Sequence, residues 1–208
     1  MNLTDRDKEI LNLVYRFKFC LGRHIKVLGN FTGSRASDRR LKILVEAGYL
    51  ARKKIIYGVP FIYTLTHMGR LLIGANKRED KIRIDRLTHD IYVLDTVIYF
   101  IEKYGISLKV IESEKELHIK DGYGARKHQP DFMFTKDGES CAVEIELNAY
   151  KTKEVLEKNI RDNYMGYDRQ IWLVNHIKAY TMLQKFTDEY SNIKILRLEE
   201  VIEHIKDR

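Results

Sequence analysis

Proline, cysteine and long apolar runs are all scarce in this sequence. Only 2 of its 208 residues are proline and 12 are glycine, which argues against a disordered chain. The two cysteines, Cys20 and Cys141, fit no zinc-binding or disulfide spacing. No apolar run approaches the roughly 18 residues of a membrane helix, and the first ten residues are too polar for a secretory signal. We therefore expect a soluble, cytoplasmic protein without disulfides or membrane contact.

The basic residues are distributed unevenly along the chain. Residues 1–80 hold 16 lysines and arginines against 7 acidic residues, whereas residues 81–208 hold 21 against 23. The net charge of +7 therefore comes from the first 80 residues. Such asymmetry suggests that this part binds nucleic acid and that the rest does something else. We expect two domains, residues 1–80 and 81–208.

The first domain has the pattern of three helices followed by a β-hairpin. Thr4 precedes the first helix, which has acidic residues in its first turn. The third helix runs from Ser34 to Ala47 and ends at Gly48. The other expected segments are a helix at 23–28, strands at 50–56 and 61–65, and a helix at 67–73.

This order resembles the winged helix-turn-helix family over about residues 3–75, and the phrase LKILVEAGYLARKKIIYG carries much of the likeness. In that family the third helix enters the major groove and the wing contacts the DNA backbone. The resemblance implies that Arg35, Arg39 and Lys42, which share one helix face, point toward DNA. The other implied contacts are Ser37 and Arg40 near phosphates, and Arg52, Lys53 and Lys54 in the wing. A merely solvated basic face and a protein-binding winged helix are the alternatives.

The second domain is expected to be α/β (α+β) with a mixed sheet. A helix at 87–104 has an apolar stripe, and Asp90 falls on the same side, either as a metal ligand or as a partner of a neighbouring group. We expect a strand at 106–112, which 114–119 extends or repeats. A later helix, 152–167, has a stripe that includes Leu156, Ile160 and Tyr164. The remaining segments are a strand at 171–174, a helix at 176–190, a strand at 193–198 and a C-terminal helix.

The stretch from His128 to Lys153, HQPDFMFTKDGESCAVEIELNAYKTK, carries the candidate chemistry. Two strand-like runs flank a turn, so they are expected to pair as a hairpin that brings Asp131 beside Glu144. Carboxylates on a half-buried sheet are costly without a positive partner, and a divalent metal is the simplest candidate.

The order helix, strand, "PD" strand, "ExE" strand, helix, strand resembles the PD-(D/E)xK restriction-endonuclease-like superfamily over about residues 87–198. The resemblance implies that Asp131 and Glu144 bind Mg²⁺ or Mn²⁺ as the cofactor, with the carbonyl of Ile145 as an extra ligand. Glu146 stands where the superfamily has a catalytic lysine. Either Glu146 is a third carboxylate that helps to hold a second metal, or the lysine role has moved to Lys153 or, second, Lys151. If neither lysine serves, the site binds metal without cutting.

Both halves together resemble the replication-relaxation family of plasmids and mobile elements, and the relaxases of the same nuclease fold. The motifs are "LTDRDKEIL", "LTHD", "PD" and "ExE". The resemblance implies a protein that nicks or binds origin DNA, with double-stranded DNA and other relaxosome or replication proteins as partners; a homodimer is left open. The sequence has no His-x-His, so the tyrosine-relaxase mechanism is excluded. The alternatives are a non-catalytic regulator or relaxosome accessory factor with a degenerate nuclease fold, and a host-defence nuclease.

Overall fold

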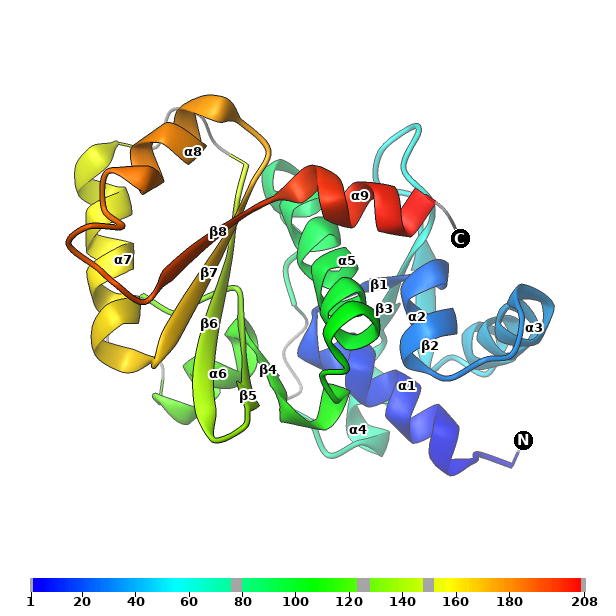
Figure 1. Ribbon diagram of the computed structural model, residues 1–208. Coiled ribbons are helices and arrows are strands. Elements are labelled where there is room, and N and C mark those ends of the chain that lie inside the picture. The colour runs from blue at the N-terminus through cyan, green and yellow to red at the C-terminus, as the bar shows by residue number, and fades with distance from the viewer. Residues whose placement is uncertain (1, 76–79, 123–127, 148–151, 207–208) are drawn as a thin grey trace. The chain divides into compact units, whose positions relative to one another are not determined.

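A computed structural model describes residues 2–75, 80–122, 128–147 and 152–206 (Figure 1). The chain divides into two compact units, Met1–Leu94 and Asp95–Arg208, and the division falls within one long helix. The expected α/β class with a mixed sheet is confirmed. Among the described residues, no helix is both long and apolar enough to cross a membrane.

The first unit contains helices and a small antiparallel sheet with strand order β1-β3-β2. Helix α1 begins after Thr4, whose side chain accepts from the backbone N–H of Asp7 while the Asp7 carboxylate accepts from the Thr4 N–H in return. This reciprocal cap explains why the helix starts where the sequence predicted. The elements of this unit are α1 (Asp5–Arg16), β1 (Cys20–Leu21), α2 (Gly22–Leu28), α3 (Ser34–Glu46), β2 (Leu50–Lys53), β3 (Ile62–Leu65), α4 (His67–Leu72) and a short 3-10 turn (Ile84–Arg86).

Two kinds of contact hold the first unit together. Apolar side chains from β1, β3 and the start of α5 form one cluster, which contains Phe19, Leu21, Ile62 and Leu87. Helices α1 and α3 are also joined by an ion pair between Asp7 and Arg40. The Asp7 side chain is fully buried, whereas the Arg40 side chain is partly exposed, so water reaches this ion pair only at Arg40.

The second unit is built on a five-stranded sheet with strand order β4-β5-β6-β7-β8. Strands β4, β5 and β6 pair antiparallel, whereas β6, β7 and β8 pair parallel, each parallel pair being joined through a helix. Helices α7 and α8 cover one face, and α5 and α9 lie on the other (Figure 1). The elements are α5 (Leu87–Tyr104), a 3-10 turn (Leu108–Val110), β4 (Ile111–Ser113), α6 (Glu114–Lys120), β5 (Phe132–Lys136), β6 (Glu139–Glu146), α7 (Lys153–Gly166), β7 (Arg169–Val174), α8 (Ile177–Gln184), β8 (Ile193–Arg197) and α9 (Leu198–Lys206).

Two segments of the second unit differ from their sequence predictions, and one is the helix expected at 176–190, which ends at Gln184. Residues 106–112 were expected to be a strand, but residues 108–110 form a 3-10 turn and only Ile111–Ser113 pairs with β5. The residues that follow form helix α6 rather than more strand, because Ser113 and Glu116 cap its first turn reciprocally. This Ser-x-x-Glu signal was present in the sequence and outweighs the apolar residues on either side of it.

Candidate functional site

Strand pairing places two buried carboxylates side by side. Phe132 of β5 pairs with Val143 of β6 in an antiparallel register, so the residue before Phe132 lies beside the residue after Val143. These two residues are Asp131 and Glu144, and only 8% and 5% of their surfaces are exposed. The Asp131 carboxylate accepts a 2.8 Å hydrogen bond from the backbone N–H of Ile145. The structure thus brings together the two residues expected to bind metal.

Glu144 also receives two side-chain hydrogen bonds. Its Oε1 atom lies 2.5 Å from His128 Nε2 and accepts a 2.9 Å bond from Asn163 Nδ2. Burial raises the pKa of Glu144; the hydrogen bond and charge of His128 oppose this rise, and the nearby Asp131 adds to it. His128 therefore favours the charged form of the Glu144 carboxyl group, whereas burial and Asp131 favour the neutral form.

Glu146 lies on the same face of the sheet as Glu144. The two residues are separated by one position in β6, so their side chains share a face, and 5% of Glu146 is exposed. The β7 partners of Glu144 and Glu146 are Trp172 and Val174, which belong to the apolar cluster under α7 and α8. This face therefore has carboxylates on β6 beside an apolar core on β7.

Helix α7 supplies the amide that covers Glu144. The sequence placed Tyr164 on the buried stripe of this helix, but Tyr164 is 43% exposed and its ring packs against Tyr190. Asn163, one position earlier and 1% exposed, faces the sheet instead. Its Nδ2 donates to Glu144, while its Oδ1 is a buried acceptor without a hydrogen-bond donor in the part of the chain that the structure describes. An unsatisfied buried carbonyl oxygen is costly unless something else binds it.

Further polar side chains surround the carboxylate pair. Gln129 donates to the carboxylate of Asp121 and accepts a 3.5 Å hydrogen bond from the Tyr167 hydroxyl. Burial, together with the nearby carboxylates of Asp121, Glu112 and Glu144, raises the pKa of Tyr167 to about 12. Tyr167 is therefore a neutral hydrogen-bond donor at physiological pH.

Three further residues were expected at the site, and one of them lies outside the described residues. Lys153 is exposed at the start of α7, and its ammonium lies 5.9 Å from the centre of the Phe186 ring, over the apolar cluster. Lys151 lies outside the described residues. Asp90 belongs to the first unit, where its Oδ1 lies 3.2 Å from His89 Nδ1. Of the two lysines proposed for the role missing at Glu146, the described one, Lys153, thus lies over Phe186.

The donor atoms are not arranged around a metal ion as they stand. Within the described ranges, no three residues of the types His, Cys, Asp and Glu are placed to hold one. At Glu144 the 2.5 Å contact with His128 is shorter than the separation of two ligands of one ion, which is roughly 3 Å. The donor chemistry nevertheless fits a divalent cation, since three buried carboxylates and the unsatisfied Asn163 Oδ1 lie on one face.

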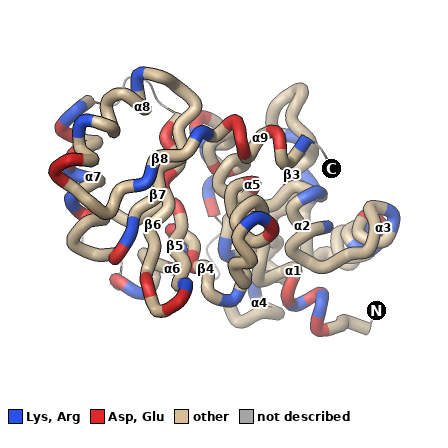
Figure 2. The backbone as a smooth tube through the Cα atoms, viewed as in Figure 1, with Lys and Arg blue, Asp and Glu red and all other residues tan. Residues whose placement is uncertain are grey.

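Three of the basic residues expected on helix α3 lie exposed, and two other expected contacts do not. Arg35, Arg39 and Lys42 are exposed, and Lys42 forms an ion pair of 3.7 Å with Glu46. The recurrence of lysine and arginine along α3 is visible in Figure 2. Ser37 is 1% exposed, and Arg40 is held by Asp7. Ser37 lies one helical turn before the buried Leu41 and faces the core with it. Neither the buried Ser37 nor Arg40, which is paired with Asp7, is therefore available to contact a phosphate.

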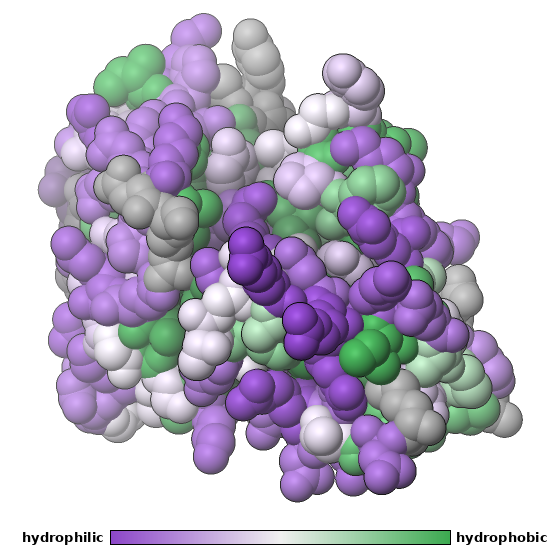
Figure 3. All heavy atoms as spheres, turned by 90° about the vertical axis from the view of Figure 1, so that its right-hand side faces the viewer, coloured by the Kyte–Doolittle hydropathy of each residue, from purple (hydrophilic) through white to green (hydrophobic). Residues whose placement is uncertain are grey.

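The hairpin between β2 and β3 carries the other predicted contacts. Arg52, Lys53 and Lys54 are exposed. The Arg52 guanidinium lies 3.9 Å from the centre of the Phe61 ring, and the Lys54 ammonium lies 5.3 Å from it. Lys54 also donates to the carbonyl of Val59. These contacts hold two basic side chains of the hairpin against the Phe61 ring. The face of the molecule drawn in Figure 3 is largely hydrophilic, with smaller apolar areas.

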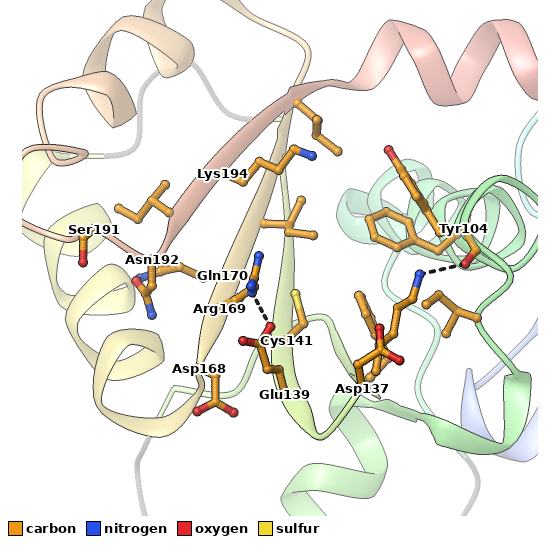
Figure 4. A pocket seen from close by; sticks show the side chains of 17 residues that line it. Tyr104, Asp137, Glu139, Cys141, Asp168, Arg169, Gln170, Ser191, Asn192 and Lys194 are labelled. Atoms are coloured by element: carbon orange, nitrogen blue, oxygen red, sulfur yellow. Dashed lines mark hydrogen bonds and ion pairs between the residues drawn. The ribbon is translucent and has the colours of Figure 1, made fainter.

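A cavity of about 710 Å³ opens on the second unit away from the carboxylates (Figure 4). Cys141 and Ile171, which line it, alternate along their strands with Ala142 and Trp172, so the cavity lies on the sheet face opposite Glu144. Its charged rim is largely paired: Arg169 Nε lies 2.5 Å from Glu139, and Lys136 donates to a backbone carbonyl. Burial raises the pKa of the Cys141 thiol to about 12, which makes it a poor nucleophile. The cavity therefore offers no chemistry comparable to that of the carboxylate face.

His128 and Asn163 were not predicted to belong to the site. His128 begins the stretch that carries the candidate chemistry, but the sequence assigned it no role there, and its contact with Glu144 joins residues 16 positions apart. Asn163 could have been found, because it lies three positions after Ile160 on the inner side of α7. Neither the family models nor the curated proteins compared with this sequence gave a match.

Proposed function

We propose that this chain is a DNA-binding protein of a plasmid or mobile element that recognises origin-like DNA and nicks it by metal-dependent phosphodiester hydrolysis. Recognition is assigned to the winged helix-turn-helix part and cleavage to the PD-(D/E)xK-like part. The partner is double-stranded DNA, with further replication or relaxosome proteins.

The observation that carries the cleavage proposal is the buried pair of Asp131 and Glu144 on neighbouring strands. Two carboxylates in this position cost free energy unless a cation or a proton compensates them. The topology also supports the proposal. Strands β4, β5 and β6 are antiparallel and β7 is parallel to β6, with α5 before and α7 between; apart from helix α6, inserted between β4 and β5, this is the order that the resemblance to PD-(D/E)xK nucleases implies.

The residues that would hold Mg²⁺ or Mn²⁺ are Asp131, Glu144 and the carbonyl of Ile145, with Glu146 as a third carboxylate. Such an ion supplies neutralisation of phosphate charge and a hydroxide-like nucleophile at neutral pH. Within the protein, the Ile145 N–H fixes the Asp131 carboxylate, and Asn163 fixes that of Glu144. Their role is to hold oxygen donors in place before DNA arrives.

DNA binding is supported by the exposed basic face of α3 and by the basic hairpin. Arg35, Arg39 and Lys42 lie on the helix that the winged-helix resemblance assigns to the major groove. Arg52 and Lys53 lie on β2, in the position of a wing. Ser37 and Arg40 are left out of this surface because one is buried and the other is paired with Asp7.

A second candidate function is a non-catalytic DNA-binding regulator or relaxosome accessory factor. It is favoured by the position of Lys153 over Phe186 and by the hydrogen bonds that already satisfy Glu144. In this case the carboxylate pair is a remnant that stabilises the second unit through its hydrogen bonds.

Paired binding and cleavage assays on supercoiled plasmid with a cognate origin separate the two candidates. Nicking that requires Mg²⁺ or Mn²⁺ and is lost in Asp131→Asn, while DNA affinity is retained, supports the enzyme. DNA binding without any strand breakage in the presence of either ion supports the regulator. Cleavage that is equally fast on plasmids without an origin instead indicates a nuclease of host-defence type.

A further inference from the structure

We propose that His128 is a nitrogen ligand of the divalent cation at Asp131 and Glu144, and that the site therefore prefers Mn²⁺ over Mg²⁺. The inference rests on the proposed metal site and goes further by naming an additional ligand and the class of metal.

Geometry places the imidazole of His128 at the carboxylate pair. Its Nε2 atom lies 2.5 Å from Glu144 Oε1, and the ring is one-fifth exposed while Glu144 is almost fully covered. Pro130 and Gln129, the residues between His128 and Asp131, are both buried, so the backbone that leads from the imidazole to β5 is held in the unit. The nitrogen therefore reaches the carboxylates from the partly open side of the site.

A second observation points to a missing ligand at the same place. Asn163 is 1% exposed, and its amide nitrogen is bonded to the same Glu144 oxygen that faces His128. Its Oδ1 has no donor among the described residues. The orphaned oxygen thus lies at the end of a side chain that is already directed at the carboxylate. A cation that takes the place of the His128–Glu144 hydrogen bond gains a nitrogen donor, and Asn163, bonded to the same Glu144 oxygen, carries an oxygen that no described group binds.

The identity of the donors predicts which metal binds. Mg²⁺ strongly prefers oxygen ligands, whereas neutral imidazole binds well to first-row transition metals. A site made only of carboxylates and carbonyls would discriminate little in favour of Mn²⁺. An imidazole ligand shifts the preference toward Mn²⁺.

The test uses the full-length protein without DNA, with Mn²⁺ and Mg²⁺ titrations followed by calorimetry and pulsed electron paramagnetic resonance of bound Mn²⁺. We expect nitrogen hyperfine coupling to bound Mn²⁺ in the wild type and its loss in His128→Ala. Mn²⁺ affinity should fall about tenfold or more in His128→Ala, with a smaller change for Mg²⁺. His118→Ala, a change in a half-exposed histidine on α6 of the same unit, is the control and should leave both affinities and the coupling unchanged.

His128→Gln guards against a variant that fails to fold, because a glutamine amide can still donate to Glu144 but has no imidazole nitrogen. Nitrogen coupling that is absent in the wild type, or that persists in both variants, overturns the assignment of His128 and leaves a carboxylate metal site intact. If the wild type binds neither ion in an Asp131-dependent way, the proposed metal site itself is wrong.

Discussion

The carboxylate of Asp131 accepts a 2.8 Å hydrogen bond from the backbone N–H of Ile145, the residue that follows Glu144. This bond spans the two strands at the end of their pairing and fixes the Asp131 side chain beside that of Glu144. The relationship matters because a metal site needs donors whose positions are set before the ion arrives. Removal of the whole Asp131 carboxylate would leave the buried N–H of Ile145 without its acceptor. Asp131→Asn is therefore the variant of choice, because the asparagine oxygen can still accept this hydrogen bond.

Arg39→Ala and Lys42→Ala are expected to weaken DNA binding uniformly across DNA sequences if both residues contact phosphate. Each lost phosphate contact should lower the slope of log affinity against log salt concentration by about 1. Fluorescence anisotropy with a labelled duplex at several salt concentrations measures both quantities. Lys158→Ala removes the same charge from an exposed position of α7 in the second unit and is the matched control. Equal losses in all three variants would assign binding to net charge rather than to α3.

Asp7→Asn is expected to destabilise the first unit by about 2 kcal/mol, since it breaks a shielded ion pair with Arg40 and weakens the cap of α1. Hydrogen exchange of the α1 amides measures the change. Asp5→Asn, at a neighbouring position whose side chain is 99% exposed, is the control and should cost far less.

The same pair predicts a pH dependence. Burial acts to raise the pKa of Asp7, but the hydrogen bonds from Arg40 and Thr4 outweigh it and lower the pKa below its ordinary value of 3.8. A lowered pKa in the folded state means that the stabilisation is complete above the ordinary pKa and is lost as pH falls through the folded value. The difference between wild type and Asp7→Asn should thus shrink below about pH 4. A difference that stays constant down to pH 2 would show that the carboxylate charge is not what stabilises this unit.

Leu183→Ala is expected to cost the second unit roughly 2–5 kcal/mol, because Leu183 is fully buried in the cluster under α7 and α8. Trp172 is the single tryptophan of the chain and lies in the same cluster, so its fluorescence reports the unfolding of this unit in urea. Ile177→Ala, on the same helix at a side chain that is 65% exposed, should change the midpoint little. Similar midpoints for both variants would contradict the assigned core.

The parts of the fold that the sequence predicted well are those with strong local signals. Thr4 and Gly48 mark the start of α1 and the end of α3, and the apolar period of α5 matches its helix. The hairpin that joins Asp131 to Glu144 was also predictable, because two short strands flank a tight turn.

The parts that escaped prediction depend on contacts between distant segments. His128 contacts Glu144, 16 positions later, and Lys153 lies over the ring of Phe186, 33 positions later; no local pattern determines either contact. On α3, Arg40 was predicted to contact phosphate, but it binds Asp7, 33 positions earlier, which no local pattern indicates. Helical spacing could have removed Ser37 from the DNA-facing set, since it lies one turn before Leu41.

The central claim is that the carboxylate pair cleaves DNA bound by the first unit. The most direct measurement follows the conversion of supercoiled origin plasmid to the nicked form with Mn²⁺ for the wild type and for Asp131→Asn, with DNA affinity measured on the same samples. We expect nicking by the wild type, a loss of at least about a hundredfold in the variant and equal affinities for DNA. Nicking that survives in Asp131→Asn at the wild-type rate, or a wild type that binds the plasmid and never breaks a strand, would contradict the claim.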